Sequence, residues 1–227
     1  MTTPSRALAI GSHPDDVELG CGATLAKWAA DGCVVSHLIC TDGSKGSWDP
    51  VEDRAALIVT RQAEQRAAAA ALGATGECVF LDAVDGELEA DVHRRREIAY
   101  WIRVLQPEIV LGHDPWKRYR LHPDHRAAGY LTVDAVVAAR DPHFFADQPV
   151  AHHRPSALWL FEADEPDHVE DVSGFVDAKV DALLAHRSQW RATLGIETDD
   201  DVTRFRARVA EDVAAVGGEA FRRIVTL

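Results

Sequence analysis

Residues 7–16, which read ALAIGSHPDD, decide the fold of this chain. Residues 7–10 form a short apolar run that ends at a glycine, as expected for a buried strand. One imidazole and two carboxylates, those of His13, Asp15 and Asp16, follow it immediately. In open parallel sheets, ligand sites lie just outside the carboxyl ends of the strands. The stretch therefore predicts a parallel strand with a functional site at its end.

Apolar runs alternate with helical patterns along the rest of the chain. Such alternation is typical of a three-layer α/β/α fold, in which a doubly wound, mostly parallel, Rossmann-like sheet has right-handed crossovers. Additional strand and helix patterns follow at the C-terminal end. Further strands are predicted at 34–40, 79–81, 109–112 and 157–161. Helices are predicted at about 20–30, 55–72, 91–105, 123–137, 175–190 and 201–216.

The length of 227 residues fits a single α/β domain, because no linker, repeat or low-complexity stretch divides it. We expect residues 1–140 to form the core sheet with the site, and residues 141–227 to be a C-terminal extension that completes the domain. Hydrophobic residues make up 47% of the chain and charged residues 27%, which fits a soluble globular enzyme and excludes a disordered chain.

Charge and cysteine content narrow the choice of partners and compartment. The chain has 24 Lys and Arg against 37 Asp and Glu, a net charge of −13. This charge repels phosphate backbones and anionic lipids, so we expect neither nucleic acid nor a membrane as partner. The four cysteines include no C-x-x-C pair and are expected to be reduced, buried thiols. With no signal-peptide pattern and no long apolar run, the expected localisation is cytoplasmic.

A second polar cluster, HPDHR at residues 122–126, follows the predicted fourth strand. His122 and His125 are three residues apart and would share one face at a helix start. Asp124 lies between them, and imidazoles that bind metals usually donate their other N–H to a carboxylate. Taken alone, each cluster also has an ordinary explanation. The carboxylates of the first could cap a helix, and the histidines of the second could be solvated.

Together the two clusters are more specific. In a strand order such as 3-2-1-4-5, strands one and four are neighbours, and the loops after them converge on one crevice. His113, at the end of the fourth strand, is placed to line it. Two histidines and one aspartate would leave an open position on the metal, as in catalytic zinc sites. Such ligands suit Zn²⁺, and would also accept Fe²⁺ or Co²⁺. Spacing alone does not decide which aspartate and which histidine of each cluster bind.

At these motifs the sequence resembles the LmbE-like (PIG-L) zinc-dependent N-acetylglucosaminyl de-N-acetylase family, which includes deacetylases of the mycothiol and bacillithiol pathways. The resemblance covers nearly the whole chain. Besides the two clusters it rests on GCGATLA at 20–26, TDG at 41–43, Arg61-x-x-Glu64, Asp85-Gly86 and the stretch HRSQ at 186–189.

The resemblance implies that His13, Asp16 and His125 bind the zinc ion. It implies a hydrolase that deacetylates an N-acetyl amino sugar or a glycoconjugate. An amide resists attack, and zinc would polarise its carbonyl and lower the pKa of bound water towards about 7.

Three further residues of the clusters would be catalytic by the same resemblance. Asp15 would be the general base that accepts the proton of the attacking water. His122, positively charged, would stabilise the developing oxyanion, and Asp124 would orient it and keep it charged. The sequence leaves open whether Asp15 or His122 returns a proton to the departing amine.

Candidate substrate-binding residues come from the resemblance and from the loops around the crevice. Arg61 and Asp85 resemble positions that meet sugar hydroxyls. The loop of residues 116–120 carries three cations and two aromatic side chains, which would stack on a sugar ring and pair with an anionic group. The remaining candidates are Trp48, Arg118, Tyr119, Arg120 and His186, the last as a support of the site. Arg120 replaces a tyrosine of some family members.

Other functions fit parts of the pattern. A nucleotide-binding oxidoreductase would need G-x-G-x-x-G after the first strand, where this chain has acidic residues that would repel a pyrophosphate. The remaining alternatives are another mononuclear-metal amidase such as a thiol-conjugate amidase, a two-metal phosphoesterase, which would need further bridging carboxylates, and a non-catalytic sugar-binding protein. Members of the family often form trimers or larger rings, so a homo-oligomer agrees with the resemblance, although no stretch specifies an interface.

Overall fold

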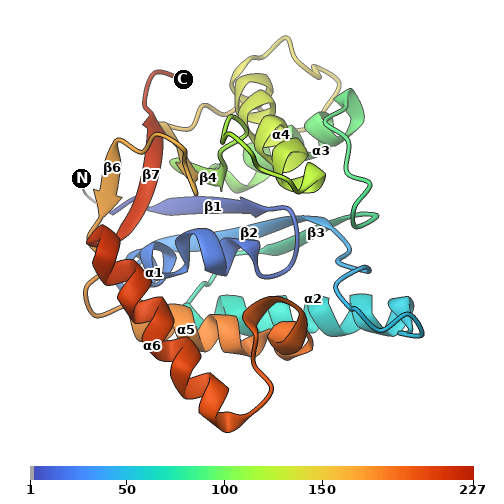
Figure 1. Ribbon diagram of the computed structural model, residues 1–227. Helices are drawn as coiled ribbons and strands as arrows, with labels where there is room; N and C mark the ends of the chain where they lie inside the picture. The colour runs from blue at the N-terminus through green and yellow to red at the C-terminus, as the bar shows by residue number, and fades with distance from the viewer. Residues whose placement is uncertain (1–2) are drawn as a thin grey trace.

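The computed structural model describes residues 3–227, which form a seven-stranded sheet between two layers of helices (Figure 1). The strands are β1 (Arg6–Gly11), β2 (Val34–Thr41), β3 (Cys78–Ala83), β4 (Ile109–His113), β5 (Ala157–Phe161), β6 (His168–Glu170) and β7 (Glu219–Ile224). The helices are α1 (Asp16–Ala30), α2 (Arg54–Ala71), α3 (Val92–Leu105), α4 (Pro123–Arg140), α5 (Val176–Ala185) and α6 (Asp199–Val216).

The strand order is β3-β2-β1-β4-β5-β7-β6. Strands β1 to β5 are parallel, and β7 pairs antiparallel with both β5 and β6. The chain builds one half of the sheet outward from β1 and then returns to place β4 on its other side. The predicted α/β class and the order 3-2-1-4-5 are therefore confirmed, and the switch point lies between β1 and β4.

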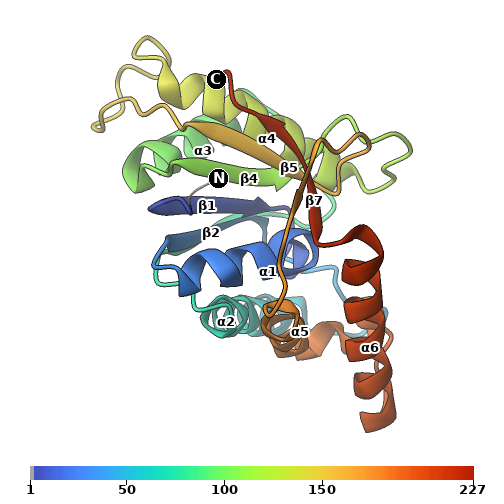
Figure 2. The same cartoon turned by 90° about the vertical axis from the view of Figure 1, so that its left-hand side faces the viewer.

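Each face of the sheet is covered by its own layer of helices, because both faces of a parallel sheet are apolar. In β1, Leu8 and Ile10 pack with α3 and α4, whereas Ala7 and Ala9 pack with α1, α2 and α5. Figure 1 shows these two layers above and below the sheet. Helix α6 packs on α5 through Phe205 and lies outside the layers, as Figure 2 shows.

Several boundaries differ from the sequence-based expectation. Strands β6 and β7 were not expected, and both lie at the antiparallel edge of the sheet. Helix α1 begins at Asp16, before the predicted start, and it bends at Cys21, whose φ of −150° and ψ of 20° are not helical. The predicted helix 175–190 ends at Ala185, where 3₁₀ and π turns continue the chain to Leu194. The four cysteines are free thiols. No helix among the described residues has the length and apolar character that crossing a membrane requires.

The bend in α1 leaves backbone N–H groups without partners inside the helix, and a side chain of β7 accepts hydrogen bonds from them. The buried carboxylate of Glu219 accepts hydrogen bonds from the N–H groups of Ala23 and Thr24, at 3.2 and 2.7 Å. The ammonium of Lys179, from α5, lies 2.6 Å from the same carboxylate. A helix start needs such acceptors, since its first N–H groups have no partner within the helix. The C-terminal strand thereby fixes the helix that begins at the predicted site.

Replacing Glu219 with alanine is expected to lower the free energy of unfolding by about 3–5 kcal/mol, because it leaves the charge of Lys179 buried without an opposite charge beside it. The matched control is Asp147→Ala, which removes an exposed ion pair with Arg96 and should cost much less. Urea unfolding of both variants measures the difference. Equal losses would show that the pair at the bend contributes no more than a surface contact.

Candidate active site

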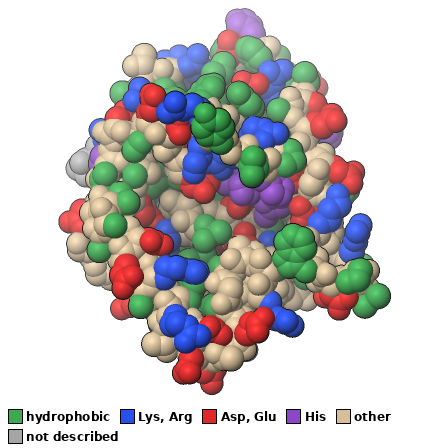
Figure 3. Space-filling model, in the orientation of Figure 1, with side chains coloured by type: hydrophobic (Ala, Val, Ile, Leu, Met, Phe, Trp, Pro, Cys, Tyr) green, Lys and Arg blue, Asp and Glu red, His purple; other side chains and the backbone are tan. Residues whose placement is uncertain are grey.

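The two polar clusters meet in a cavity of about 430 Å³ at the carboxyl ends of β1 and β4. In Figure 3 histidine side chains, drawn purple, gather at the hollow of this face. The cavity receives side chains from α1 and its preceding turn, from α2, and from the loops after β2, β3, β4 and α5. The lining residues are His13, Asp15, Asp16, Leu19, Lys45, Gly46, Ser47, Trp48, Arg61, Asp85, His122, His125, Gln189, Ala192 and Thr193.

Three side chains in this cavity converge as metal ligands would. Nδ1 of His13 lies 3.3 Å from Nε2 of His125 and 3.3 Å from a carboxylate oxygen of Asp16. The other oxygen of Asp16 lies 3.3 Å from Nε2 of His125. Ligand atoms about 2.0–2.2 Å from a tetrahedral ion are about 3.3–3.6 Å apart. The donor set thus fits one small divalent ion.

The electrostatics of the cluster favour a positive charge at this position. Burial lowers the pKa of His13, but hydrogen bonds to Asp124, Asp16 and Asp85 outweigh it and raise that pKa well above the usual value. Burial alone would raise the pKa of the Asp16 carboxyl. The imidazoles of His113 and His125 outweigh this effect and hold that pKa well below its usual range. A metal ion would replace a proton that the carboxylates already attract.

Asp15 lines the cavity and does not cap α1. It precedes the helix with a φ of 106°, and its side chain makes no hydrogen bond to the N–H groups of the first turn. Instead its carboxylate lies 3.3 Å from the guanidinium of Arg61. Burial, opposed by the charge of Arg61, raises the pKa of Asp15 to about 6. A carboxylate with a pKa near neutrality is suited to accept and return a proton.

Asp124 contacts a different imidazole from the one expected. One oxygen of its buried carboxylate lies 3.1 Å from Nε2 of His13 and accepts from the N–H of Gly86, and the other accepts from the N–H of Leu88. The expectation that this carboxylate orients His122 is therefore wrong in the structure. Its hydrogen bond leaves Nδ1 of His13 directed at Asp16 and His125, as expected for the outer partner of a ligand.

His122 caps α4. Its Nδ1 accepts the N–H of Asp124 at 3.3 Å, which places the ring proton on Nε2. Burial and the neighbouring imidazoles of His13 and His125 lower the pKa of His122. The expected positive charge is therefore not favoured, and the side chain offers a neutral N–H donor at the cavity wall.

A network of the buried His113 and Arg120 with the exposed Glu162 supports Asp16, and none of these three residues lines the cavity. Nε2 of His113 lies 3.2 Å from Asp16, and Nδ1 lies 3.2 Å from Glu162, which follows β5. The guanidinium of Arg120 contacts both, at 3.0 Å from His113 and 2.8 Å from Glu162. Sequence reasoning placed His113 at the crevice but missed Glu162. The signal for Glu162 was its position, because it follows a parallel strand at the same sheet edge as the two clusters.

The candidate substrate-binding residues divide into two groups. Trp48, Arg61 and Asp85 line the cavity. The other four do not line it. Arg120 is buried against His113, His186 is fully buried against Glu18, Arg118 pairs with Asp164, and Tyr119 is 92% exposed. Of the candidate substrate-binding residues, the first three are therefore accessible from the cavity, whereas Arg120 and His186 are packed outside its lining.

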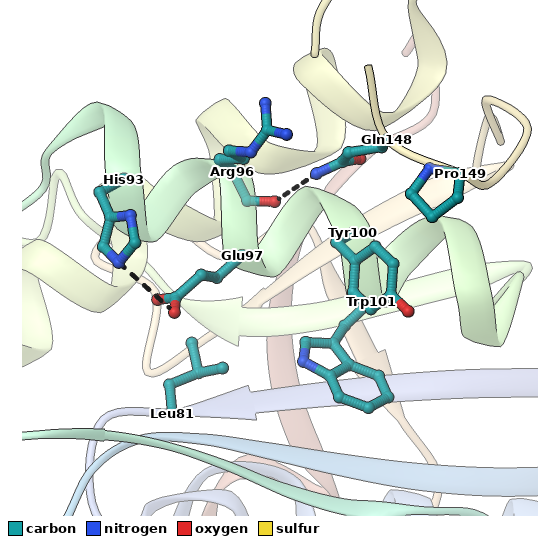
Figure 4. A pocket seen from close by; sticks show the side chains of 8 residues that line it. All are labelled: Leu81, His93, Arg96, Glu97, Tyr100, Trp101, Gln148 and Pro149. Atoms are coloured by element: carbon teal, nitrogen blue, oxygen red, sulfur yellow. Dashed lines mark hydrogen bonds and ion pairs between the residues drawn. The ribbon is translucent and has the colours of Figure 1, made fainter. Parts of the chain in front are cut away.

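A second cavity, of about 370 Å³, lies along α3 and shares no residue with the first (Figure 4). Two of its polar side chains are already paired. His93 lies 3.6 Å from Glu97, and the side chain of Gln148 donates to the carbonyl of Arg96. Figure 4 shows the rings of Tyr100 and Trp101 beside these pairs. The cavity offers no convergent set of free donors.

Replacing Asp124 with asparagine is expected to weaken metal binding about 10–100-fold, because His13 loses the carboxylate that orients it. Asp134→Asn on the same helix is the control, since its carboxylate lies at the surface near Arg95. Titration of each protein with zinc against a competing chelator measures the affinities. Unchanged affinity in the Asp124 variant would exclude this role.

Comparisons with known proteins agree with this geometry. Residues 8–136 match the family model described as PIG-L, GlcNAc-PI de-N-acetylase. The chain is 36% identical to the diacetylchitobiose deacetylase of Thermococcus kodakarensis, over 82% of this chain and 70% of that protein. It is 31% identical to the 1D-myo-inositol 2-acetamido-2-deoxy-alpha-D-glucopyranoside deacetylase of Actinosynnema mirum, over 83% and 82%. Among solved structures, the N,N'-diacetylchitobiose deacetylase of Pyrococcus horikoshii superposes with a TM-score of 0.86 at 27% identity, covering 98% of this chain and 84% of that one.

Proposed function

The chain belongs to the GlcNAc-PI de-N-acetylase (PIG-L) family, and we propose that it is a metal-dependent hydrolase that removes the acetyl group of an N-acetylated amino sugar or glycoconjugate. One observation carries the proposal. His13, Asp16 and His125 present ligand atoms within 4.8 Å of one another, while the carboxylate of Asp15 lies in the same cavity outside this group of ligands. A metal site with a spare carboxylate beside it is the arrangement that amide hydrolysis needs.

We propose that His13, Asp16 and His125 hold a single zinc ion. When bound, the ion polarises an amide carbonyl and lowers the pKa of water. Two imidazoles and one carboxylate suit zinc, and would also accept Fe²⁺ or Co²⁺.

Asp15 is proposed as the general base of the hydrolysis. Its carboxylate accepts a proton from the attacking water while the new C–O bond forms at the amide carbon. When the C–N bond breaks, the departing nitrogen takes up a proton, so that acetate and a free amine leave. Arg61, 3.3 Å from the carboxylate, keeps Asp15 directed into the cavity. A base of this kind contributes about 10²–10⁴-fold to the rate.

His122 is proposed to stabilise the negative charge that develops on the carbonyl oxygen. Its Nδ1 is occupied by the N–H of Asp124, so its Nε2–H is the group available to the substrate. A neutral donor serves this purpose, because a fixed N–H dipole already stabilises an oxyanion. Around the reacting amide, Trp48 and Asp85 are the proposed sugar contacts.

The alternative of a two-metal phosphoesterase is less well supported. Two further groups of three donors each share a histidine with the first: His13, Asp85 and His122 share His13, and His113, His125 and Glu162 share His125. The guanidinium of Arg120 contacts both His113 and Glu162, so a positive charge already lies beside that pair. The donors therefore favour one ion.

The test is acetate release from N-acetylglucosamine and N,N'-diacetylchitobiose, measured together with the free amine. We expect both products in equal amounts from the zinc-loaded protein, loss of activity after dialysis against a chelator, and recovery when zinc is returned. Chelated protein that keeps full activity would refute the metal dependence. Zinc-loaded protein that releases neither product would refute the deacetylase proposal for these sugars.

A further inference from the structure

The backbone of Asp15 adopts a conformation that residues with a side chain rarely take. Its φ is 106° and its ψ is −25°. Conformations of this kind persist only where the surroundings hold them, and they gather at functional sites. The N–H of Asp15 donates a hydrogen bond of 3.0 Å to Oε1 of Gln65, a residue of α2 that is fully buried. Gln65 is therefore a candidate for holding this conformation.

The amide of Gln65 can adopt only one orientation. Its NH₂ group donates to the carboxylate of Glu18 at 2.7 Å and lies 3.3 Å from Nδ1 of His37. A carboxylate only accepts a hydrogen bond, and a backbone N–H only donates one. Rotating the amide by 180° would set its NH₂ against the N–H of Asp15 and its oxygen against Glu18. Its carbonyl must therefore face Asp15.

Glu18 also lies beside a residue from the C-terminal part of the chain. Nε2 of His186, which follows α5, lies 3.4 Å from the second oxygen of Glu18, and both side chains have no exposed surface. Glu18 belongs to the first turn of α1, and Gln65 to the middle of α2. Helices α1 and α2 and the residue after α5 thus meet near Asp15 through polar side chains, in a region where an unmatched polar group is costly.

We propose that Gln65 is a positioning residue for the proposed reaction, and that it holds the backbone of Asp15 so that the carboxylate points into the cavity. The inference rests on the proposed function, because that function makes Asp15 the base. Gln65 does not line the cavity, so it acts through Asp15 and not on the substrate.

Loss of this hydrogen bond would affect Asp15 more than the neighbouring ligand. Asp16 is anchored independently, since its carboxylate accepts the N–H of His13 at 2.7 Å and lies 3.2 Å from His113. A rotation at residue 15 would therefore displace the base and leave the metal ligands in place. Displacements of about 1 Å in a catalytic group cost on the order of 10²-fold in rate.

The experiment compares zinc-loaded wild-type protein with Gln65→Met, which is close in size but has no carbonyl or amide group. The control is Gln62→Met on the same helix, where Gln62 donates only to Asp82 near the surface. We expect the amide hydrogen of residue 15 to exchange at least ~10-fold faster in the Gln65 variant. We also expect kcat to fall about 10–100-fold, KM to change less than about 3-fold, and zinc content to stay at the wild-type value.

If Gln65→Met does not fold, Gln65→Asn replaces it in the experiment. The shorter amide keeps its polarity but cannot reach both Asp15 and Glu18. Wild-type exchange at residue 15 together with wild-type kcat in a folded variant would overturn the proposal. Activity that falls only in proportion to the zinc lost from the variant would overturn the proposal as well. The exchange rate does not depend on activity. If the wild-type protein released no acetate, the proposed function would fail while the structural role of Gln65 could still be measured.

Discussion

Replacing Asp15 with asparagine is expected to lower kcat about 10²–10⁴-fold while the protein keeps its metal ion. Asparagine has the same shape as aspartate but cannot accept a proton from water. Asp15 is not among the three converging ligands, so the metal should remain bound. The measurement is acetate release together with elemental analysis of the same sample, with Asp134→Asn as the control.

A near-normal rate in metal-loaded Asp15→Asn would show that another group is the base. The pH dependence gives a second check. Burial raises the pKa of Asp15 to about 6, and the base must be ionised to work. The value of kcat/KM should therefore fall as the pH decreases through this region, and a bound divalent cation would move the fall to lower pH. The asparagine variant should lack this acid limb.

Replacing His125 with alanine is expected to abolish tight metal binding and, with it, activity, by about 10³-fold or more. Of the three converging ligands, His125 is the most exposed, and its ring stacks on His113 and His122 at centroid distances of 4.6 and 4.8 Å. Removing it leaves only His13 and Asp16 for the ion. Zinc content after gel filtration and acetate release measure the two losses together.

His93→Ala is the matched control, because His93 is an exposed histidine of α3. It should change neither zinc content nor rate. An alanine variant of His125 that kept one zinc per chain and its activity would place the metal elsewhere.

The grouping of the two clusters could be predicted because it depends on topology alone. His13 and Asp16 follow β1, His125 lies in the first turn of α4 after β4, and the order of a doubly wound sheet makes these strands neighbours. Local sequence thus sufficed to expect the cavity, and the family resemblance supplied the choice of ligands within each cluster.

The partner of Asp124 could not be predicted, because it depends on how the first turn of α4 is rotated against the loop after β3. The N–H groups of Gly86 and Leu88 donate hydrogen bonds to the oxygens of this carboxylate, which draws Asp124 towards His13 and away from His122. The spacing of residues in the sequence shows which of them are neighbours along a helix. It does not show which residues of a distant loop they contact.

The buried charges were missed for a related reason. Arginine and glutamate are mostly exposed, so their residue types do not indicate that Arg120 and Glu219 are buried. Each is buried beside a partner of opposite charge about 40 residues away in the chain, Glu162 for Arg120 and Lys179 for Glu219. Strand β7 was missed with Glu219, because an antiparallel strand near the sheet edge carries polar residues that hide its apolar pattern.

Anomalous X-ray diffraction from crystals grown with zinc, collected on both sides of the zinc absorption edge, tests the central claim most directly. We predict one zinc ion per chain, bound by Nδ1 of His13, a carboxylate oxygen of Asp16 and Nε2 of His125, with Asp15 beside it but not bound. An ion bound only at other residues, or two ions of equal occupancy in the cavity, would contradict it.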